Sequence, residues 1–219
     1  MTENLIHEDR LAGITLARGS HGTPKQGLCL MEAVAYVRGI SHTDTPACVS
    51  PALGAFGRKL NDMLPDDLRQ ELKPLIVKLP GTAEDGKDER RGFMSANWAV
   101  RVLLPVALDG AGLATTAQEL RDLAPVIDVA SARLACTAAR GARAAAYAIA
   151  AADAAAAAYA IAAYAIAAYA TADAATAAAY AATAAYAATA DAADAALRTQ
   201  IHRMSIEFFI QLIDAEVTS

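Results

Sequence analysis

A run of alanine between residues 142 and 196 limits what this chain can fold into. Most of the run is alanine, the rest is almost entirely Tyr, Ile, Thr and Asp, and neither Gly nor Pro interrupts it. Alanine is the strongest helix former because it has no side-chain entropy to lose. The composition therefore predicts one long helix, which would measure about 80 Å at about 1.5 Å per residue.

The tyrosines of this predicted helix do not form a single stripe. Tyr159, Tyr164 and Tyr169 are spaced by five residues, so each is rotated by about 140° from the one before it. Because no heptad is sustained, a conventional coiled coil is disfavoured. We expect the small alanines to let helix backbones approach while tyrosines fill the gaps. The resulting interface in a homo-oligomer would use Tyr159, Tyr164, Tyr169 and Tyr180.

Three other interpretations of the run stay open. It is a solvated spacer arm, or it binds ice as Ala-rich antifreeze helices do, although its threonines do not share one face. In the third interpretation it crosses a membrane. An uncharged stretch of 19 residues separates Asp153 from Asp173, against the roughly 20 residues that a span needs. Against a span, alanine adds little to insertion and tyrosine prefers the membrane interface.

The composition changes after residue 196. Leu197, Ile201, Met204 and Phe208 recur at helical spacing, which predicts an amphipathic helix within residues 197–219. A solvated apolar face of this size is unfavourable. We therefore expect this helix to dock on the globular part of the chain, on the alanine-rich helix or on a second copy.

Residues 1–125 have the mixed composition of a small globular domain and read as several short helices. Ser50 followed by Pro51 predicts the start of a helix, and Pro74 should kink or end one. The predicted fold class is all-α or nearly so. The predicted domain organisation is a helical domain over 1–125, a long Ala/Tyr-rich helix over 126–196 and an amphipathic segment over 197–219.

Charge and cysteine content narrow the function classes. The net charge is −5 and basic residues are scattered, so no nucleic-acid interface is indicated. Three cysteines and a polar, charged opening of the chain predict a cytoplasmic protein with reduced thiols. Phosphate-binding loops, dinucleotide fingerprints and serine nucleophile motifs do not occur.

One group of residues has the composition of a chemical site. The group lies on two predicted loops that flank one short helix and consists of His21, Cys29, Glu32, His42, Asp44 and Cys48. A tetrahedral zinc site needs four nitrogen or sulfur ligands, and His21, Cys29, His42 and Cys48 would supply them. Their spacing differs from that of zinc fingers, in which the ligands form close pairs.

Cys29 also offers a catalytic interpretation of the same group. It lies at a predicted helix N-terminus, where the dipole lowers a thiol pKa, and His42 would be its base. No nucleophile motif surrounds it. The alternative, which the sequence favours, is a structural role with a buried thiol and two hydrogen-bonded loop histidines and with no cofactor.

Two segments of the first half carry a resemblance to a known family. They read GSHGTPKQGLCLMEAVAYVRGISHTDTPACVSPALGAFGRKLND and DERRGFMSANWAVRVLLPVAL. They resemble a family of uncharacterised proteins from actinobacteria and their phages, in which a GSH-CLMEAVA module is joined to a variable Ala-rich tail. The resemblance covers about the first half of the chain and implies no established activity.

Together these patterns favour a structural or interaction protein over an enzyme. It would display a small helical domain and self-associate through the alanine-rich helix. Two alternatives are a metal-binding or cysteine-dependent enzyme domain with a helical oligomerisation arm, and a membrane-associated protein.

Overall fold

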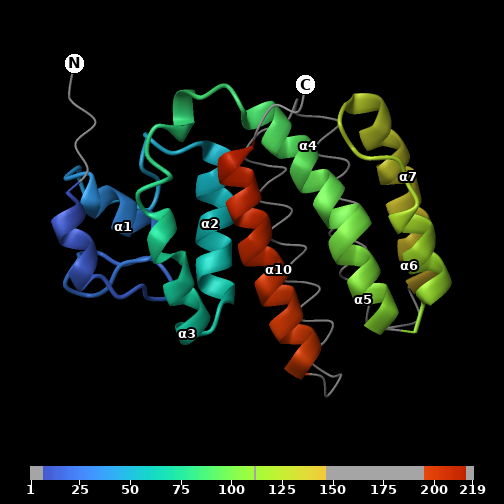
Figure 1. The fold of residues 1–219 in the computed structure, drawn as a ribbon, viewed down its shortest axis with the longest axis horizontal. Helices are drawn as coiled ribbons and strands as arrows, with labels where there is room; N and C mark the ends of the chain where they lie inside the picture. Colours follow the sequence, from blue (N-terminus) through green and yellow to red (C-terminus); the bar gives the residue numbers. More distant parts are fainter. Residues whose placement is uncertain (1–6, 111, 147–194, 216–219) are drawn as a thin grey trace.

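The computed structural model describes residues 7–110, 112–146 and 195–215. Helices account for all the regular elements in these ranges, so the all-α prediction is confirmed. The helices form one continuous hydrophobic core. Figure 1 shows them side by side, with the N-terminal helices at one end and α6 and α7 at the other.

The chain enters the fold through a 3₁₀ helix, η1 (Glu8–Gly13), which packs against the first α-helix. An isolated parallel β-bridge then joins Leu16 to Leu28. The amide of Ala17 donates to the Leu28 carbonyl at 2.9 Å. Residues 14–17 thus form a packed segment with one strand-like contact, in which Ile14 and Leu16 are buried.

Local signals mark the end of the first α-helix and the start of the second. α1 spans Leu30–Val37 and stops before Gly39, whose φ of 65° lies in the left-handed region that favours glycine. α2 spans Pro51–Met63. The Ser50 hydroxyl caps α2 by accepting the Leu53 amide at 3.3 Å, and proline occupies the first helical position.

Proline shapes the segment that follows α2. α3 (Asp66–Arg69) is a single turn, and it continues as the 3₁₀ helix η2 (Gln70–Leu75), which contains Pro74. Proline lacks the amide hydrogen and its ring clashes with the preceding turn, so the predicted interruption is confirmed. A further 3₁₀ turn, η3 (Thr82–Glu84), precedes the longest helical stretch of the first half.

This stretch consists of three consecutive helical elements, and the helix that follows it folds back on the last of them. α4 (Asp88–Trp98) runs into the π-helical turn η4 (Ala99–Leu103) and then into α5 (Leu104–Gly110). Pro105 in the first turn of α5 cannot donate to the preceding turn, and a wider π turn accommodates the missing hydrogen bond. α6 (Ala114–Arg121) packs back on α5.

The two helices that flank the alanine-rich segment both belong to the core. α7 spans Val129–Ala146, and its Ala132 and Ala139 are fully buried. α10 spans Ala195–Asp214, and it lies between α2 and α4 (Figure 1). Parts of all three predicted segments of the chain therefore pack into one folded body.

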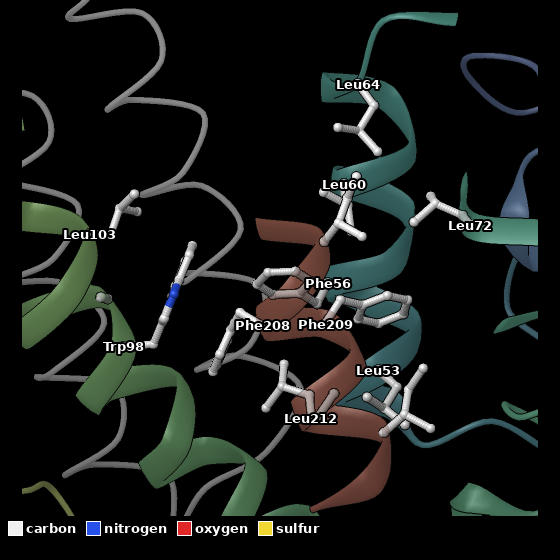
Figure 2. Close-up of a cluster of buried hydrophobic side chains, with 14 of the residues drawn as sticks. Leu53, Phe56, Leu60, Leu64, Leu72, Trp98, Leu103, Phe208, Phe209 and Leu212 are labelled. Atoms are coloured by element: carbon white, nitrogen blue, oxygen red, sulfur yellow. The ribbon is translucent and has the colours of Figure 1, made fainter. Parts of the chain in front are cut away.

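Aromatic side chains from three helices meet at the centre of this body (Figure 2). Phe56 of α2 lies 5.6 Å from the ring centroids of both Phe208 and Phe209 of α10. Trp98 of α4 stacks on Phe208 with centroids 4.5 Å apart. We call these four residues the aromatic junction. All four side chains are buried in the core.

The apolar stripe of the C-terminal helix faces its own chain. Ile201 and Phe208 are buried in the core, and Leu197 and Met204 are partly buried against it. The side chain of Leu197 reaches Gly110 at the end of α5. Within the described residues, the stripe packs on the globular part of the chain, which is one of its three predicted docking partners.

A buried arginine fastens the end of α10. Arg91 of α4 is fully buried and donates from Nε to the Leu212 carbonyl at 3.0 Å. Its other nitrogens bond both carboxylate oxygens of Asp85 at 2.9 and 2.6 Å. Burial opposes the charge on Asp85, but these bonds outweigh it and hold the pKa of that carboxyl below its ordinary value. The pair thus caps the last carbonyls of α10.

The predictions for the alanine-rich segment 147–194 lie outside the described residues, as do its tyrosines. Among the helices that are described, none combines the length and the apolar character needed to cross a membrane. The predicted interface tyrosines in the undescribed segment are Tyr159, Tyr164, Tyr169 and Tyr180.

Candidate functional site

The first turn of α1 organises the candidate site. Cys29 is the N-cap residue of α1, and its sulfur accepts the Glu32 amide at 3.5 Å. In return, the Glu32 carboxylate accepts the Cys29 amide at 2.8 Å. This reciprocal pair is a capping box, with cysteine in the place that serine or threonine usually takes. The spacing Cys-x-x-Glu in the sequence is the local signal for it.

The carboxylate of Glu32 also binds the loop that precedes α1. Its oxygens accept the Ser20 hydroxyl at 3.1 Å, the His21 amide at 2.6 Å and His21 Nδ1 at 2.9 Å. Glu32 is fully buried. Burial alone would raise its pKa, but the hydrogen bonds from His21, Cys29 and Ser20 outweigh burial and lower the pKa to about 2. The group is therefore a carboxylate throughout the physiological pH range.

The second histidine joins the cluster from the loop that follows α1. His42 Nε2 donates to the His21 carbonyl at 2.6 Å and lies 3.6 Å from the nearer Glu32 oxygen. His42 Nδ1 is buried and has no hydrogen-bond partner among the described residues. The structure thus gathers both predicted histidines around one carboxylate. We call Ser20, His21, Cys29, Glu32 and His42 the Glu32 cluster.

The state of Cys29 differs from the one that the catalytic interpretation requires and agrees with the buried thiol of the structural interpretation. Its placement at a helix N-terminus is confirmed, but the lowering of its pKa that the catalytic interpretation predicts is wrong. Burial raises the pKa of this thiol to about 12, and the negative charge of Glu32 acts in the same direction. Because the thiolate is the nucleophile, a thiol that stays protonated near neutral pH is poorly suited to that role.

The four predicted zinc ligands do not form one group. Cys48 belongs to a different contact, in which its carbonyl accepts the amides of Gly81 and Ala83 at 2.8 and 3.4 Å. Within the part of the chain that the structure describes, no three His, Cys, Asp or Glu side chains are placed to hold a metal ion. His21 and His42 are brought together, while Cys29 is engaged in the helix cap.

Residues that the sequence did not single out hold the cluster from the side of α2. Asn61 accepts the Leu30 amide at 3.1 Å and donates to the Ala17 carbonyl at 2.9 Å. Asp62 accepts the Gly19 amide at 2.8 Å. These contacts join residues 31 to 44 positions apart in the sequence, so no local pattern could reveal them.

The space beside the cluster is small. The cavity there measures about 50 Å³. The residues that line it are Gly19, Ser20, Cys29, Asp44, Arg58 and Asp62. That volume is well below the roughly 300–1,000 Å³ typical of small-molecule sites. Because four hydrogen bonds occupy the Glu32 carboxylate and the cavity is small, we interpret the Glu32 cluster as a structural link between the loops that flank α1 and the helices α1 and α2.

Gly27 allows the loop to close over this structural link. Its φ is 136°, a conformation that side chains rarely adopt, and an added Cβ would lie 2.8 Å from His21 Nε2. Both the backbone conformation and the close contact with His21 therefore favour glycine at position 27.

No protein-family model, curated protein or solved structure matches this chain. The interpretation of the site accordingly depends on its own geometry.

Proposed function

We propose that this is a structural or interaction protein that self-associates through its alanine-rich segment. In this proposal the helical body holds the segment 147–194 at both of its ends and presents it to other copies. A cytoplasmic setting is part of the proposal, supported by cysteines that carry free thiols in the structure.

The observation that carries the proposal is the anchoring of both flanks of the segment. Ala142 of α7 and Ile201 of α10 are both buried in the same core. Leu197, three residues beyond the segment, rests on Gly110 of α5. A segment tied to one body at both ends is well placed to be displayed by that body, and small alanines with interspersed tyrosines favour close packing between copies.

The Glu32 cluster supports this role better than it supports an enzyme. Its cysteine is held as a thiol, its carboxylate is occupied by four hydrogen bonds, and the neighbouring cavity is about 50 Å³. The resemblance to a family with a variable Ala-rich tail agrees with this proposal, in which a folded helical domain carries an alanine-rich segment.

The test is the mass of the full-length chain in solution over a wide concentration range. Sedimentation equilibrium should show reversible association for the natural sequence. Replacing Tyr159, Tyr164, Tyr169 and Tyr180 by alanine should shift association to higher concentration by at least about tenfold, or about 1.4 kcal/mol. A matched control exchanges four neighbouring alanines for serine and keeps the tyrosines. These controls are Ala160, Ala165, Ala170 and Ala181.

Two results would remove the proposal. One is a monomer at every concentration reached. The other is association that the tyrosine and serine variants change equally, because the tyrosines would then make no specific contribution.

A further inference from the structure

A pocket formed by N-terminal residues has the properties of an anion site. None of the five residues of the Glu32 cluster is among the described residues that line it. It measures about 570 Å³, within the roughly 300–1,000 Å³ of typical small-molecule sites. Its walls come from η1, the packed segment after it, the loop before α1 and Tyr36 of α1. We call it the basic pocket, and we propose that it binds a small organic oxyanion, either a carboxylate or a phosphate monoester.

The lining of the basic pocket is positively charged. Arg10 and Lys25 are the charged side chains among the described residues that line it, and both are cationic. The whole chain carries a net charge of −5, so a pocket whose described lining has two cations and no carboxylate differs in charge from the chain as a whole. A concave surface with charges of one sign focuses the field and attracts ligands of the opposite sign.

Arg10 is held in position before any ligand arrives. Its Nη1 donates to the Tyr36 carbonyl at 2.8 Å, and the guanidinium carbon lies 5.2 Å from the centroid of the Tyr36 ring. One nitrogen is thus engaged by the protein, while the planar group keeps further N–H donors. A fixed guanidinium loses little conformational entropy when it binds a carboxylate or phosphate.

Neutral donors complete the wall. Thr15 and Gln26 both line the pocket. The Gln26 side-chain oxygen accepts the Thr23 hydroxyl at 3.3 Å, which orients the amide and leaves its NH₂ group as a donor. Hydroxyl and amide donors beside two cations match the several acceptor oxygens of an oxyanion.

Part of the pocket lining is well supported. Leu28 and Ala17 also line the pocket, and they are joined by the backbone hydrogen bond of the β-bridge region at 2.9 Å. Leu28 itself is buried in the core, which fixes this part of the lining. Apolar residues and cations in one lining favour a ligand with a compact organic body that carries one anionic group.

The experiment uses the full-length protein and three probes that share a benzene ring. Phenyl phosphate and benzoate carry the two candidate anions, and benzyl alcohol is the neutral control. Isothermal titration calorimetry at low salt should detect one or both anions with a dissociation constant of about 1 mM or tighter, and no matching heat from the alcohol. The two anion titrations tell a phosphate site from a carboxylate site.

Variants locate the binding. Arg10→Gln should weaken anion binding by at least about tenfold, because it removes the fixed charged donor. Gln26→Glu should weaken it to a similar extent by placing a negative charge in the wall, and it keeps the oxygen that Thr23 binds. Arg133→Gln removes the same charge from an exposed position on α7 and should leave binding unchanged.

The Glu variant keeps the test decisive if the Arg10 variant fails to fold. The inference is overturned if neither anion binds at about 10 mM. It is equally overturned if benzyl alcohol binds as well as the anions, or if Gln26→Glu and Arg133→Gln bind the anions alike. None of these outcomes depends on self-association, so the pocket and the proposed function stand or fall separately.

Discussion

The Glu32 cluster and the aromatic junction are both buried, but opposite kinds of interaction hold them together. In the cluster, one carboxylate collects directional hydrogen bonds from residues within 12 positions of it. In the junction, Phe56 of α2 meets rings of α4 and α10, which lie far apart in the sequence. The first region closes local loops, whereas the second joins α2 and α4 to α10, which follows much later in the sequence.

This difference predicts how each region fails. Apolar contacts are non-directional, and truncating a buried apolar side chain lowers the free energy of unfolding in proportion to the cavity that it leaves. The junction should therefore be most sensitive to truncation. A buried carboxylate stabilises only while it is charged and satisfied, so the cluster should be most sensitive to a loss of charge.

The largest expected effect is in the junction. Phe56→Ala should lower the free energy of unfolding by about 3–5 kcal/mol, because it leaves a cavity between three helices. Urea unfolding followed by circular dichroism measures it. Val102→Ala is the control: Val102 is 37 % exposed, so its truncation should cost under about 1 kcal/mol. Similar losses for the two variants would contradict the central role of the junction.

The next effect is in the cluster. Glu32→Gln keeps the size of the side chain but removes the charge that four donors share, and we expect a loss of about 2–4 kcal/mol. Glu119→Gln makes the same chemical change at an exposed position of α6 and should be nearly neutral. A stable Glu32→Gln variant would show that the carboxylate is not what fastens the loops.

The same carboxylate predicts the pH dependence of stability. Its pKa is about 2 in the folded chain against an ordinary value of 4.5. A carboxyl whose pKa is lowered by folding stabilises the folded state at every pH above the ordinary pKa of 4.5. This contribution, about 3 kcal/mol, is lost as the pH falls from 4.5 toward 2. Urea titrations across this window should show the natural protein losing its advantage over Glu32→Gln. A constant difference between the two proteins would contradict the prediction.

Gly27→Ala separates close packing from backbone conformation. Both the left-handed φ and the contact with His21 oppose a side chain there, so we expect a loss of about 1–3 kcal/mol. Gly86→Ala is a matched control, because Gly86 also has a positive φ but an added Cβ meets nothing within 4 Å. Thermal unfolding should show the larger loss for Gly27. Equal losses would mean that only backbone conformation matters.

The smallest effect is expected at the surface of α10. Arg203 pairs with Glu71 at 2.6 Å, with both side chains at least 40 % exposed. Exposed ion pairs contribute little, so Arg203→Ala should change the free energy of unfolding by under about 1 kcal/mol. A double-mutant cycle with Glu71→Ala measures the coupling. A coupling of several kcal/mol would show that charge, rather than the aromatic junction, docks α10.

Local sequence signals predicted the elements that depend on neighbours along the chain. The cap at Ser50 and the interruption at Pro74 both follow from backbone chemistry within a few residues. They are confirmed because such preferences need no tertiary contact. The apolar stripe of the C-terminal helix was predicted for the same reason.

The candidate site was predicted in part. The proximity of His21 and His42 followed from two loops flanking one helix. The buried thiol that the sequence favours at position 29 is confirmed. The catalytic alternative predicts the pKa of Cys29 in the wrong direction, because burial outweighs the effect of the helix terminus. The roles of Asn61 and Asp62 could not be predicted, since they reach the cluster from another helix.

Preferences that act over a few residues are enough to predict an all-α fold, the helix cap at Ser50, the break at Pro74 and the apolar stripe of α10. These features follow from the backbone chemistry of serine and proline and from apolar periodicity. The position of α10 between α2 and α4, the burial of α7 in the same core and the contacts of Asn61 with the loop before α1 become visible only in the folded chain. Burial and ring packing depend on which distant surfaces meet, and no local pattern specifies that choice.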